Sequence, residues 1–328
     1  MNGRVRVAGT ALAAALLLTG VAGCGGDSLE ENGAESASPS SNGADPGSGG
    51  GKGDLVIGSA GFTESAVLAE LYAKLLSDAG YHTSVQTLAN RELYEPALEK
   101  GQIDVVPEYA ATLAEFLNAK KNGPSAKPVA SGDVNATVAA LTTLATPRGL
   151  KVLTVGQAVD QNAFAVSKDF ASKHNLKTLS DLGASKLKIK LAAGDECPDR
   201  PFCEPGLKSK YGIDITGIDP KGVGTPQAKQ AVKDGTDQLV LTTTTDATLE
   251  QYDLVLLTDD KHLQNADNVL PVVNAKDAGD PAIAAALDKL TAVLTTADLT
   301  ELNKKVDAER LKPADVAADY LKSKGLSK

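Results

Sequence analysis

The chain has 328 residues, of which 42% are hydrophobic and 23% charged, a globular balance with room for two medium-sized domains. Its formal net charge of -9 argues against a nucleic-acid-binding surface, which needs a basic face. The three histidines lie far apart, without the spacing of metal ligands, so metal catalysis has little support in the sequence. We therefore predict a protein that uses no metal or other cofactor.

The first 24 residues have the pattern of a bacterial export signal. Arg4 and Arg6 precede an apolar run at residues 7–18, which has the length of a signal core and is too short to span a membrane. The run leads to Val-Ala-Gly-Cys at residues 21–24, which resembles the cleavage and lipidation motif of bacterial lipoproteins. We predict a signal peptide at residues 1–23 and a lipid on Cys24. A plain secreted protein with a stray cysteine is the alternative.

The next segment, residues 25–53, is rich in Gly, Ser, Asn, Ala, Asp and Glu and has almost no large apolar residue. It cannot bury enough surface to fold, so residues 24–53 are predicted to be a lipidated cysteine and a flexible tether. A lipid anchor of this kind holds a domain near a membrane without inserting it. The predicted location is the outer face of the cell membrane.

Strand and helix patterns alternate from residue 54 onward. A strand at residues 55–57 leads into a turn of small residues and a helix that begins near Thr63, with leucines at three- and four-residue spacing. This strand–turn–helix unit suits an anion or a carboxylate, although it lacks the Gly-Lys-Ser/Thr of a phosphate loop. The alternation predicts an α/β protein with a largely parallel sheet.

The segment at residues 101–112 carries the most specific local pattern. Residues 103–106 are apolar and β-branched, which predicts a short buried strand. Pro107 is expected to end that strand and to begin a helix on which Tyr109 and Thr112, three residues apart, share a face. A phenol and a hydroxyl at the carboxyl end of a strand indicate a ligand site. An ordinary strand–helix unit with a packed tyrosine is the alternative.

Two cysteines remain after Cys24, namely Cys197 and Cys203. They lie six residues apart in a chain predicted to be exported, so we predict a disulfide that closes this loop. Arg200 lies inside the loop, and a guanidinium offers a rigid fork for a carboxylate. A surface arginine on a stapled loop is the alternative.

Three motifs fall in order at the spacing of a known family. They are Gly-Ser-x-x-Phe-Thr-Glu at residues 58–64, Ala-Leu-x-x-Gly-x-Ile-Asp at residues 97–104, and Pro-Glu-Tyr-x-x-Thr at residues 107–112. From residue 54 to its C-terminus, the chain resembles the substrate-binding proteins of osmoprotectant ABC importers. Proteins of that family bind glycine betaine, choline, carnitine or proline betaine.

The resemblance implies a two-lobe α/β fold of the type II periplasmic-binding-protein kind, with a cleft between the lobes and two crossing segments. The first lobe would comprise residues 54–156 and 249–328, and the second lobe residues 157–248. The protein would be no enzyme, and it would bind no nucleic acid. It would deliver a small compatible solute to the permease and ATPase subunits of an importer.

The resemblance also implies where the solute binds. Tyr109 and Thr112 would contact it from the first lobe, and Arg200 would grip its carboxylate from the second. Members of the family hold the quaternary ammonium in a cage of several tyrosines, by cation–π attraction. The predicted ligand-binding residues of this chain are Tyr109, Thr112, Arg200, Ala60, Phe62, Asn162, Phe164 and Thr243.

Most of the cage is missing from this sequence, in which aromatic residues make up only 4%. The cage positions other than Tyr109 fall near Asn162, Lys229 and Thr243, none of them aromatic. Phe164 and Phe202 are the rings that lie near enough in the sequence to substitute.

Three alternatives to a glycine betaine receptor remain open. A lipoprotein of the same fold could bind a different polar solute, such as a hydroxylated one, or it could be an interaction protein that has lost the betaine cage. An enzyme on the same lobes is the third alternative. Glu64, Asp104 and Glu108 are acids near the predicted cleft, but no Ser/His/Asp order, metal cluster or phosphate loop in the sequence supports catalysis.

Overall fold

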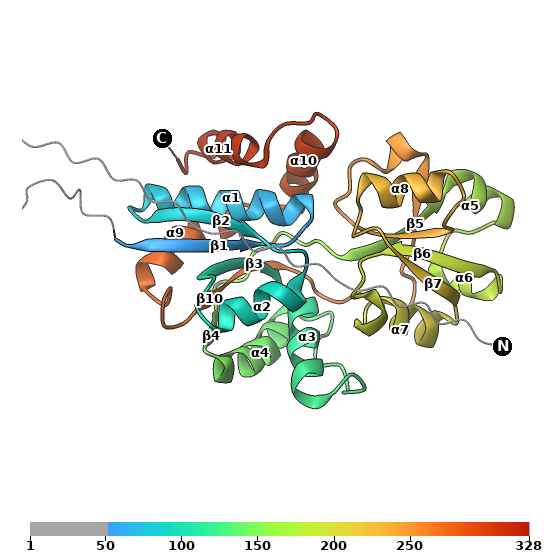
Figure 1. Ribbon diagram of the computed structural model, residues 1–328, viewed down its shortest axis with the longest axis horizontal. Helices are drawn as coiled ribbons and strands as arrows, with labels where there is room; N and C mark the ends of the chain where they lie inside the picture. Colours follow the sequence, from blue (N-terminus) through green and yellow to red (C-terminus); the bar gives the residue numbers. More distant parts are fainter. Residues whose placement is uncertain (1–51, 328) are drawn as a thin grey trace, which may run out of the picture. The chain divides into compact units, whose positions relative to one another are not determined.

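The computed structural model describes residues 52–327, which belong to one compact unit (Figure 1). This unit holds two five-stranded sheets, which we call the first and the second lobe together with the helices that cover them. The predicted signal peptide, Cys24 and the tether up to residue 51 lie outside the described residues.

The first lobe contains a mixed sheet in the order β2-β1-β3-β10-β4. β1 runs parallel to β2 and β3, whereas β10 runs antiparallel to β3 and β4. All residues of β3 and β10 are buried, as expected for central strands that are covered on both faces. The strands span Asp54–Ser59 (β1), His82–Thr87 (β2), Val105–Tyr109 (β3), Leu150–Val152 (β4) and Val269–Asn274 (β10).

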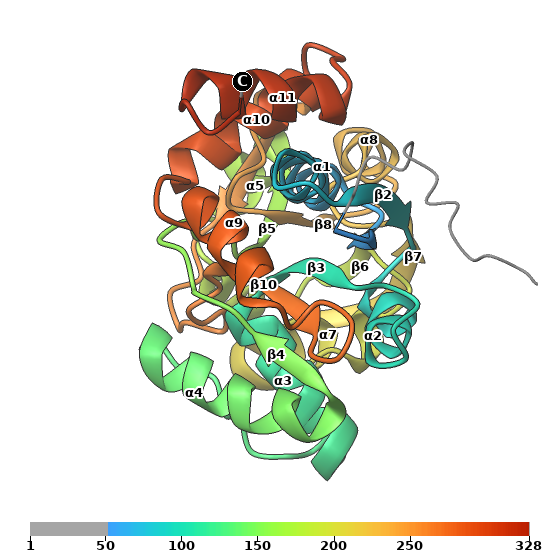
Figure 2. The same ribbon diagram turned by 90° about the vertical axis from the view of Figure 1, so that its left-hand side faces the viewer.

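Helices cover both faces of this sheet (Figure 2). One face carries α1 (Thr63–Asp78), α9 (Pro281–Thr291), α10 (Thr296–Asp307) and α11 (Pro313–Ser323). The opposite face carries α2 (Arg91–Glu99), α3 (Ala110–Asn122) and α4 (Val134–Ala145).

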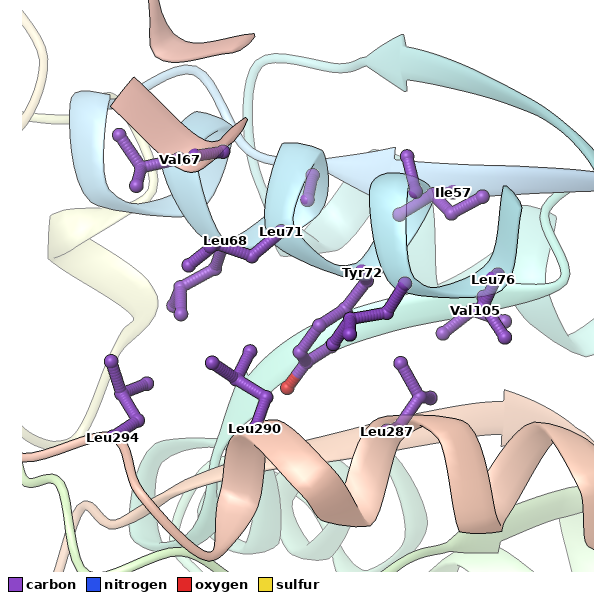
Figure 3. Close-up of a cluster of buried hydrophobic side chains, with 14 of the residues drawn as sticks. Ile57, Val67, Leu68, Leu71, Tyr72, Leu76, Val105, Leu287, Leu290 and Leu294 are labelled. Atoms are coloured by element: carbon purple, nitrogen blue, oxygen red, sulfur yellow. The ribbon is translucent and has the colours of Figure 1, made fainter. Parts of the chain in front are cut away.

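The core between α1 and its neighbours explains why ten of the sixteen residues of α1 are buried. Leu68, Leu71 and Tyr72 of α1 lie close to Leu287 and Leu290 of α9 (Figure 3). Each of these side chains is at most 2% exposed, and burial of such side chains stabilises the fold by about 1.5–3 kcal/mol each. α1 is thereby held rigidly, with its N-terminal end at the edge of the sheet where β1 stops.

The second lobe contains a sheet in the order β7-β6-β8-β5-β9. β6 runs parallel to β7 and β8, and β5 runs antiparallel to β8 and β9. The strands span Asn162–Ser167 (β5), Lys188–Ala193 (β6), Asp214–Pro220 (β7), Leu239–Thr243 (β8) and Leu254–Leu257 (β9). The helices span Lys168–His174 (α5), Leu179–Ala184 (α6), Glu204–Gly206 (α7) and Pro226–Lys233 (α8).

The expected return to the first lobe at residue 249 is too early. β9 pairs with β5 and therefore belongs to the second lobe, because its apolar run extends the sheet at that edge. The two lobes are joined by residues 153–161 and 258–268, and these segments lie side by side where Val159 forms an antiparallel bridge with Asn268. The α/β architecture with two crossing segments is confirmed, but the second crossing follows β9. The expected largely parallel sheet is wrong, because β10 and β5 each run antiparallel to both of their neighbours.

The expected helix start at Pro107 is also wrong. Pro107 lies inside β3, directly opposite Pro271 of β10, and α3 begins only at Ala110. A pair of prolines fits an antiparallel ladder where neither residue must donate to the other strand. On its other side β3 pairs with β1 only at Val105, so the missing N–H of Pro107 leaves no ladder bond unmade there.

Candidate functional site

A cavity of about 390 Å³ lies between the two lobes. Its walls come from the ends of β1, β3, β6 and β8, where ligands bind in open α/β sheets, and from the first residue of β5. The side chains used below are Ala60, Phe62, Asn90, Arg91, Tyr94, Tyr109, Thr112, Asp160, Asn162, Glu196, Arg200, Thr243 and Asp267.

Seven of the eight residues predicted to bind ligand line this cavity, and Phe164 does not. Phe164 is 1% exposed and packs in the core of the second lobe. Side chains two residues apart on a strand point to the same face, but Phe164 lies about 7 Å further along β5 than Asn162. That distance takes it from the cleft edge to the part of the sheet that helices cover.

The turn after β1 forms one wall of the cavity, with Ala60 and Phe62. The backbone N–H of Ala60 donates to Ser65 Oγ in the first turn of α1, at 2.8 Å. Gly58 is required nearby, since a Cβ there would lie 2.6 Å from Val106 Cγ1 of the neighbouring strand. The small residues of this motif thus allow close strand packing and fix the turn.

A buried ion pair that the sequence did not reveal stands behind the same wall. Arg91 donates to Glu108 through Nε at 2.8 Å and through Nη2 at 2.7 Å, and Tyr94 Oη donates to Glu108 Oε1 at 2.7 Å. Arg91 Nη2 also donates to Thr112 Oγ1 at 3.0 Å. Burial would lower the pKa of Arg91, but the adjacent Glu108 carboxylate raises it well above its usual range.

Tyr109 is the residue before the first turn of α3, with an extended backbone, so it does not share a helix face with Thr112. Its hydroxyl donates to Glu64 Oε1 at 2.7 Å, while the Thr112 hydroxyl accepts from Arg91. The ring of Tyr109 lies 6.3 Å from that of Phe62. Both Tyr109 and Thr112 therefore reach the cavity, but by different geometry from the one predicted.

Glu64 links the two lobes at the base of the cleft. Its Oε2 accepts from Thr245 Oγ1 of the second lobe at 2.7 Å and from Asn303 Nδ2 of α10 at 2.8 Å. Burial raises the pKa of Glu64, and its hydrogen bonds oppose this only in part. Burial and the nearby Glu64 carboxylate likewise raise the pKa of Asp160 well above its usual range.

Arg200 reaches across the cleft from the second lobe to the first. Its guanidinium donates to both oxygens of Glu92 in α2, through Nε at 3.1 Å and Nη2 at 2.7 Å. Glu196 Oε1 lies 3.7 Å from the same Nη2. Burial would raise the pKa of Glu92, but the hydrogen bonds and charge of Arg200 lower it. The fork that the sequence predicted for a ligand carboxylate is thus occupied by a carboxylate of the protein.

The loop that carries Arg200 is short and closely held. The Sγ atoms of Cys197 and Cys203 lie 1.99 Å apart. The backbone N–H of Arg200 donates to Cys197 O at 3.3 Å, and that of Cys203 donates to Arg200 O at 2.9 Å. These contacts fix the backbone from which the guanidinium extends.

Lys229, which falls near a cage position in the sequence, does not line the cavity. It is 2% exposed, and its Nζ lies 2.9 Å from Asp246 Oδ2 in the second lobe. It therefore places no free cation in the site. The aromatic side chains that line the cavity are Phe62, Tyr94 and Tyr109, all of them from the first lobe.

Residues 52–327 contain no group of three or more His, Cys, Asp or Glu side chains that could hold a metal ion. Across the same residues, every helix is too short or too polar to cross a membrane.

The fold and the cleft define a class of protein: a two-lobe, solute-binding protein. Residues 53–323 match the family described as the substrate-binding domain of ABC-type glycine betaine transport systems, and the chain belongs to this family. It is therefore a substrate-binding protein of an ABC transporter, which is an extracytoplasmic component. The predicted family and two-lobe fold are confirmed.

Individual relatives support the assignment at modest identity. A glycine-betaine-binding protein of Pseudomonas aeruginosa is 28% identical over 281 residues, which cover 82% of this chain and 87% of that relative. The glycine betaine-binding protein YehZ of Escherichia coli is 27% identical and covers 83% of this chain and 91% of its own length. A solved structure described as a glycine betaine/carnitine/choline ABC transporter has a TM-score of 0.61 at 22% identity, covering 83% of this chain and 99% of its own.

Proposed function

We propose that this protein is the receptor of an ABC importer for a small zwitterionic compatible solute of the glycine betaine type. The cleft would close on the solute and present it to the permease and ATPase subunits. In this proposal residues 1–23 are a signal peptide, Cys24 carries the lipid, and the tether up to residue 53 holds the two lobes at the outer face of the membrane. The family and the relatives' names support the solute class.

One observation carries the proposal: a guanidinium of the second lobe and two rings of the first lobe line the same cavity. Arg200 supplies a planar fork that matches a carboxylate, and Tyr109 and Phe62 supply the faces that attract a cation. A zwitterion has both groups, so it bridges the two lobes. Asn162 and Thr243 add polar contacts from the second lobe.

The loop that carries Arg200 would be held by a disulfide between Cys197 and Cys203 in the exported protein. The closeness of their Sγ atoms supports this pairing. The bond would hold Arg200 on a loop of only a few residues, where disulfides add about 2 kcal/mol of stability by the chain-entropy account.

Calorimetric titration of the two-lobe domain tests the proposed function. We expect glycine betaine to bind with one site per chain, because one cavity is lined both by Arg200 and by the rings of Tyr109 and Phe62, and glucose at the same concentration to give no heat of binding. The chain has no tryptophan, so calorimetry is better suited than intrinsic fluorescence. Binding of glucose or another uncharged polyol instead of any zwitterion would favour the alternative of a different polar solute.

Glu92 adds a prediction, because a solute carboxylate must replace it at Arg200. We expect Glu92→Gln to raise the affinity for glycine betaine about tenfold, since the neutral amide competes less well for the guanidinium and about 1.4 kcal/mol corresponds to tenfold. Calorimetry with both variants measures the change.

The matched control for this variant is Glu99→Gln, at the end of the same helix. Glu99 pairs with Arg148 at 2.8 Å and does not line the cavity. Its replacement should leave the affinity unchanged. An equal or lower affinity in Glu92→Gln would mean that Glu92 does not compete with the solute.

A further inference from the structure

Asp267 places a buried carboxylate at the cavity wall where the second crossing segment passes. Its Oδ1 accepts from the backbone N–H groups of Ala111 and Thr112 at the start of α3, both at 2.9 Å. Among residues 52–327, no donor forms a hydrogen bond with its Oδ2. The side chain is only 2% exposed, so Oδ2 can accept a further hydrogen bond only from a group inside the cavity.

The positive charge that acts on Asp267 is already paired with another carboxylate. Arg91, whose positive charge acts on Asp267, donates through both Nε and Nη2 to Glu108. On the adjacent crossing segment lies Asp160, a second buried acid, whose N–H donates to Asp267 O at 3.2 Å. Burial, only partly offset by the hydrogen bonds and by Arg91, raises the pKa of Asp267 to about 7. Near neutral pH only about half of the Asp267 carboxyls are therefore ionised; above that pH the group carries a negative charge that no side chain of the described residues fully offsets.

The rings of the cavity do not enclose a cation. Phe62, Tyr94 and Tyr109 all come from the first lobe, and the hydroxyls of Tyr94 and Tyr109 are turned to buried carboxylates. The second lobe faces them with Asn162 and Thr243. A quaternary ammonium is stabilised by surrounding ring faces and cannot donate a hydrogen bond. A carboxylate binds more strongly to a cation that can donate one, because the hydrogen bond adds to the attraction between the charges.

We propose that Asp267 binds the cationic end of the solute by accepting a hydrogen bond from its ammonium group, an inference that rests on the proposed function. The cleft then favours a protonated amine with at least one N–H over a quaternary ammonium. The carboxylate end of the same solute occupies Arg200 as before. Among solutes of the glycine betaine type, the cleft would bind an N-methylated amino acid that keeps one N–H more tightly than the fully methylated betaine.

A pair of solutes that differ by one methyl group tests this inference. Dimethylglycine keeps the carboxylate of glycine betaine and has one N–H in place of one N-methyl group. At about pH 8, where Asp267 is ionised, we expect calorimetry to give a dissociation constant for dimethylglycine about tenfold below that for glycine betaine, or about 1.4 kcal/mol. Asp267→Asn should bring the ratio of the two constants to about one.

The asparagine variant keeps the fold-related contact, because its amide oxygen can still accept from Ala111 and Thr112. Asp133→Asn is the matched control: Asp133 also accepts from two backbone N–H groups at a helix start, in α4, and does not line the cavity. It should leave both dissociation constants unchanged.

Tighter binding of glycine betaine than of dimethylglycine by the unmodified protein would overturn the inference, whatever the stability of the variant. A preference for dimethylglycine that survives Asp267→Asn would also overturn it, since another group would then receive the N–H. In both cases the proposed function stands, because a zwitterion binds. Binding of neither solute would reject the proposed function, and the inference with it.

Discussion

Replacing Arg200 with alanine is expected to weaken the binding of glycine betaine by at least about 100-fold. Truncating one partner of a hydrogen-bonded charge pair costs about 2–5 kcal/mol, and 1.4 kcal/mol corresponds to tenfold. The variant removes both N–H groups of the fork and leaves Glu92 facing the cleft without its partner. An unpaired carboxylate there repels the carboxylate of the solute as well. Calorimetric titration of the purified variant measures the loss.

Two further variants separate the fork from the charge. Arg200→Lys keeps a positive charge but offers no planar pair of donors, so its affinity should fall between those of the wild type and the alanine variant. Arg148→Ala is the control, because Arg148 forms an ion pair with Glu99 at 2.8 Å and does not line the cavity. It should bind as the wild type does. Wild-type affinity in Arg200→Ala would show that no solute carboxylate uses Arg200.

Replacing Arg91 with methionine is expected to lower the free energy of unfolding by about 3–5 kcal/mol. Removing one partner of a buried ion pair leaves an uncompensated buried charge, and such losses fall in this range. Arg91 is 5% exposed and Glu108 is 1% exposed, and Arg91 also holds the Thr112 hydroxyl. Urea-induced unfolding, followed by far-UV circular dichroism, gives the free energy difference.

The double variant Arg91→Met with Glu108→Gln distinguishes an unpaired charge from lost packing. It removes the charge that the single variant leaves behind, so it should recover a large part of the stability. If the single variant unfolds within 1 kcal/mol of the wild type, Glu108 must find water or another partner, and the buried pair does not hold this wall together.

The fold could be predicted from the sequence because its signals are local and mutually consistent. Apolar strands alternate with helices of leucine spacing, and the three motifs at residues 58–64, 97–104 and 107–112 occur in the order of the family. Two of the errors arose where a long-range pairing overrides a local signal. Pro107 stays in β3 because Pro271 lies opposite it, and β9 belongs to the second lobe because β5 pairs with it.

Residues of the cavity lining could be predicted only where a residue matches a family motif. Tyr109, Thr112 and Arg200 were found in this way, and all three line the cavity. The partners that decide their chemistry were not found, because they are distant in sequence. Glu92 lies 108 residues from Arg200, and Asp267 lies 155 residues from Thr112. No local pattern marks such a pair.

Arg91 and Asp267 illustrate what remains hidden before a fold is known. An arginine at the start of an amphipathic helix and an aspartate in a loop are ordinary surface residues by pattern. Their burial and partners follow from the packing of α2, α3 and the crossing segments around one cavity. The acidic character of the cavity wall is therefore a property of the tertiary structure alone.

The central claim is that the solute carboxylate binds to Arg200 in the cavity between the lobes. It is tested most directly by a crystal structure of the two-lobe domain in complex with glycine betaine or dimethylglycine, whichever binds more tightly. We expect the solute in the cavity between the lobes, with its carboxylate oxygens about 2.8 Å from the guanidinium of Arg200 and Glu92 displaced from it. A solute bound elsewhere, or one whose carboxylate lies away from Arg200 while Glu92 keeps both hydrogen bonds, would contradict the account.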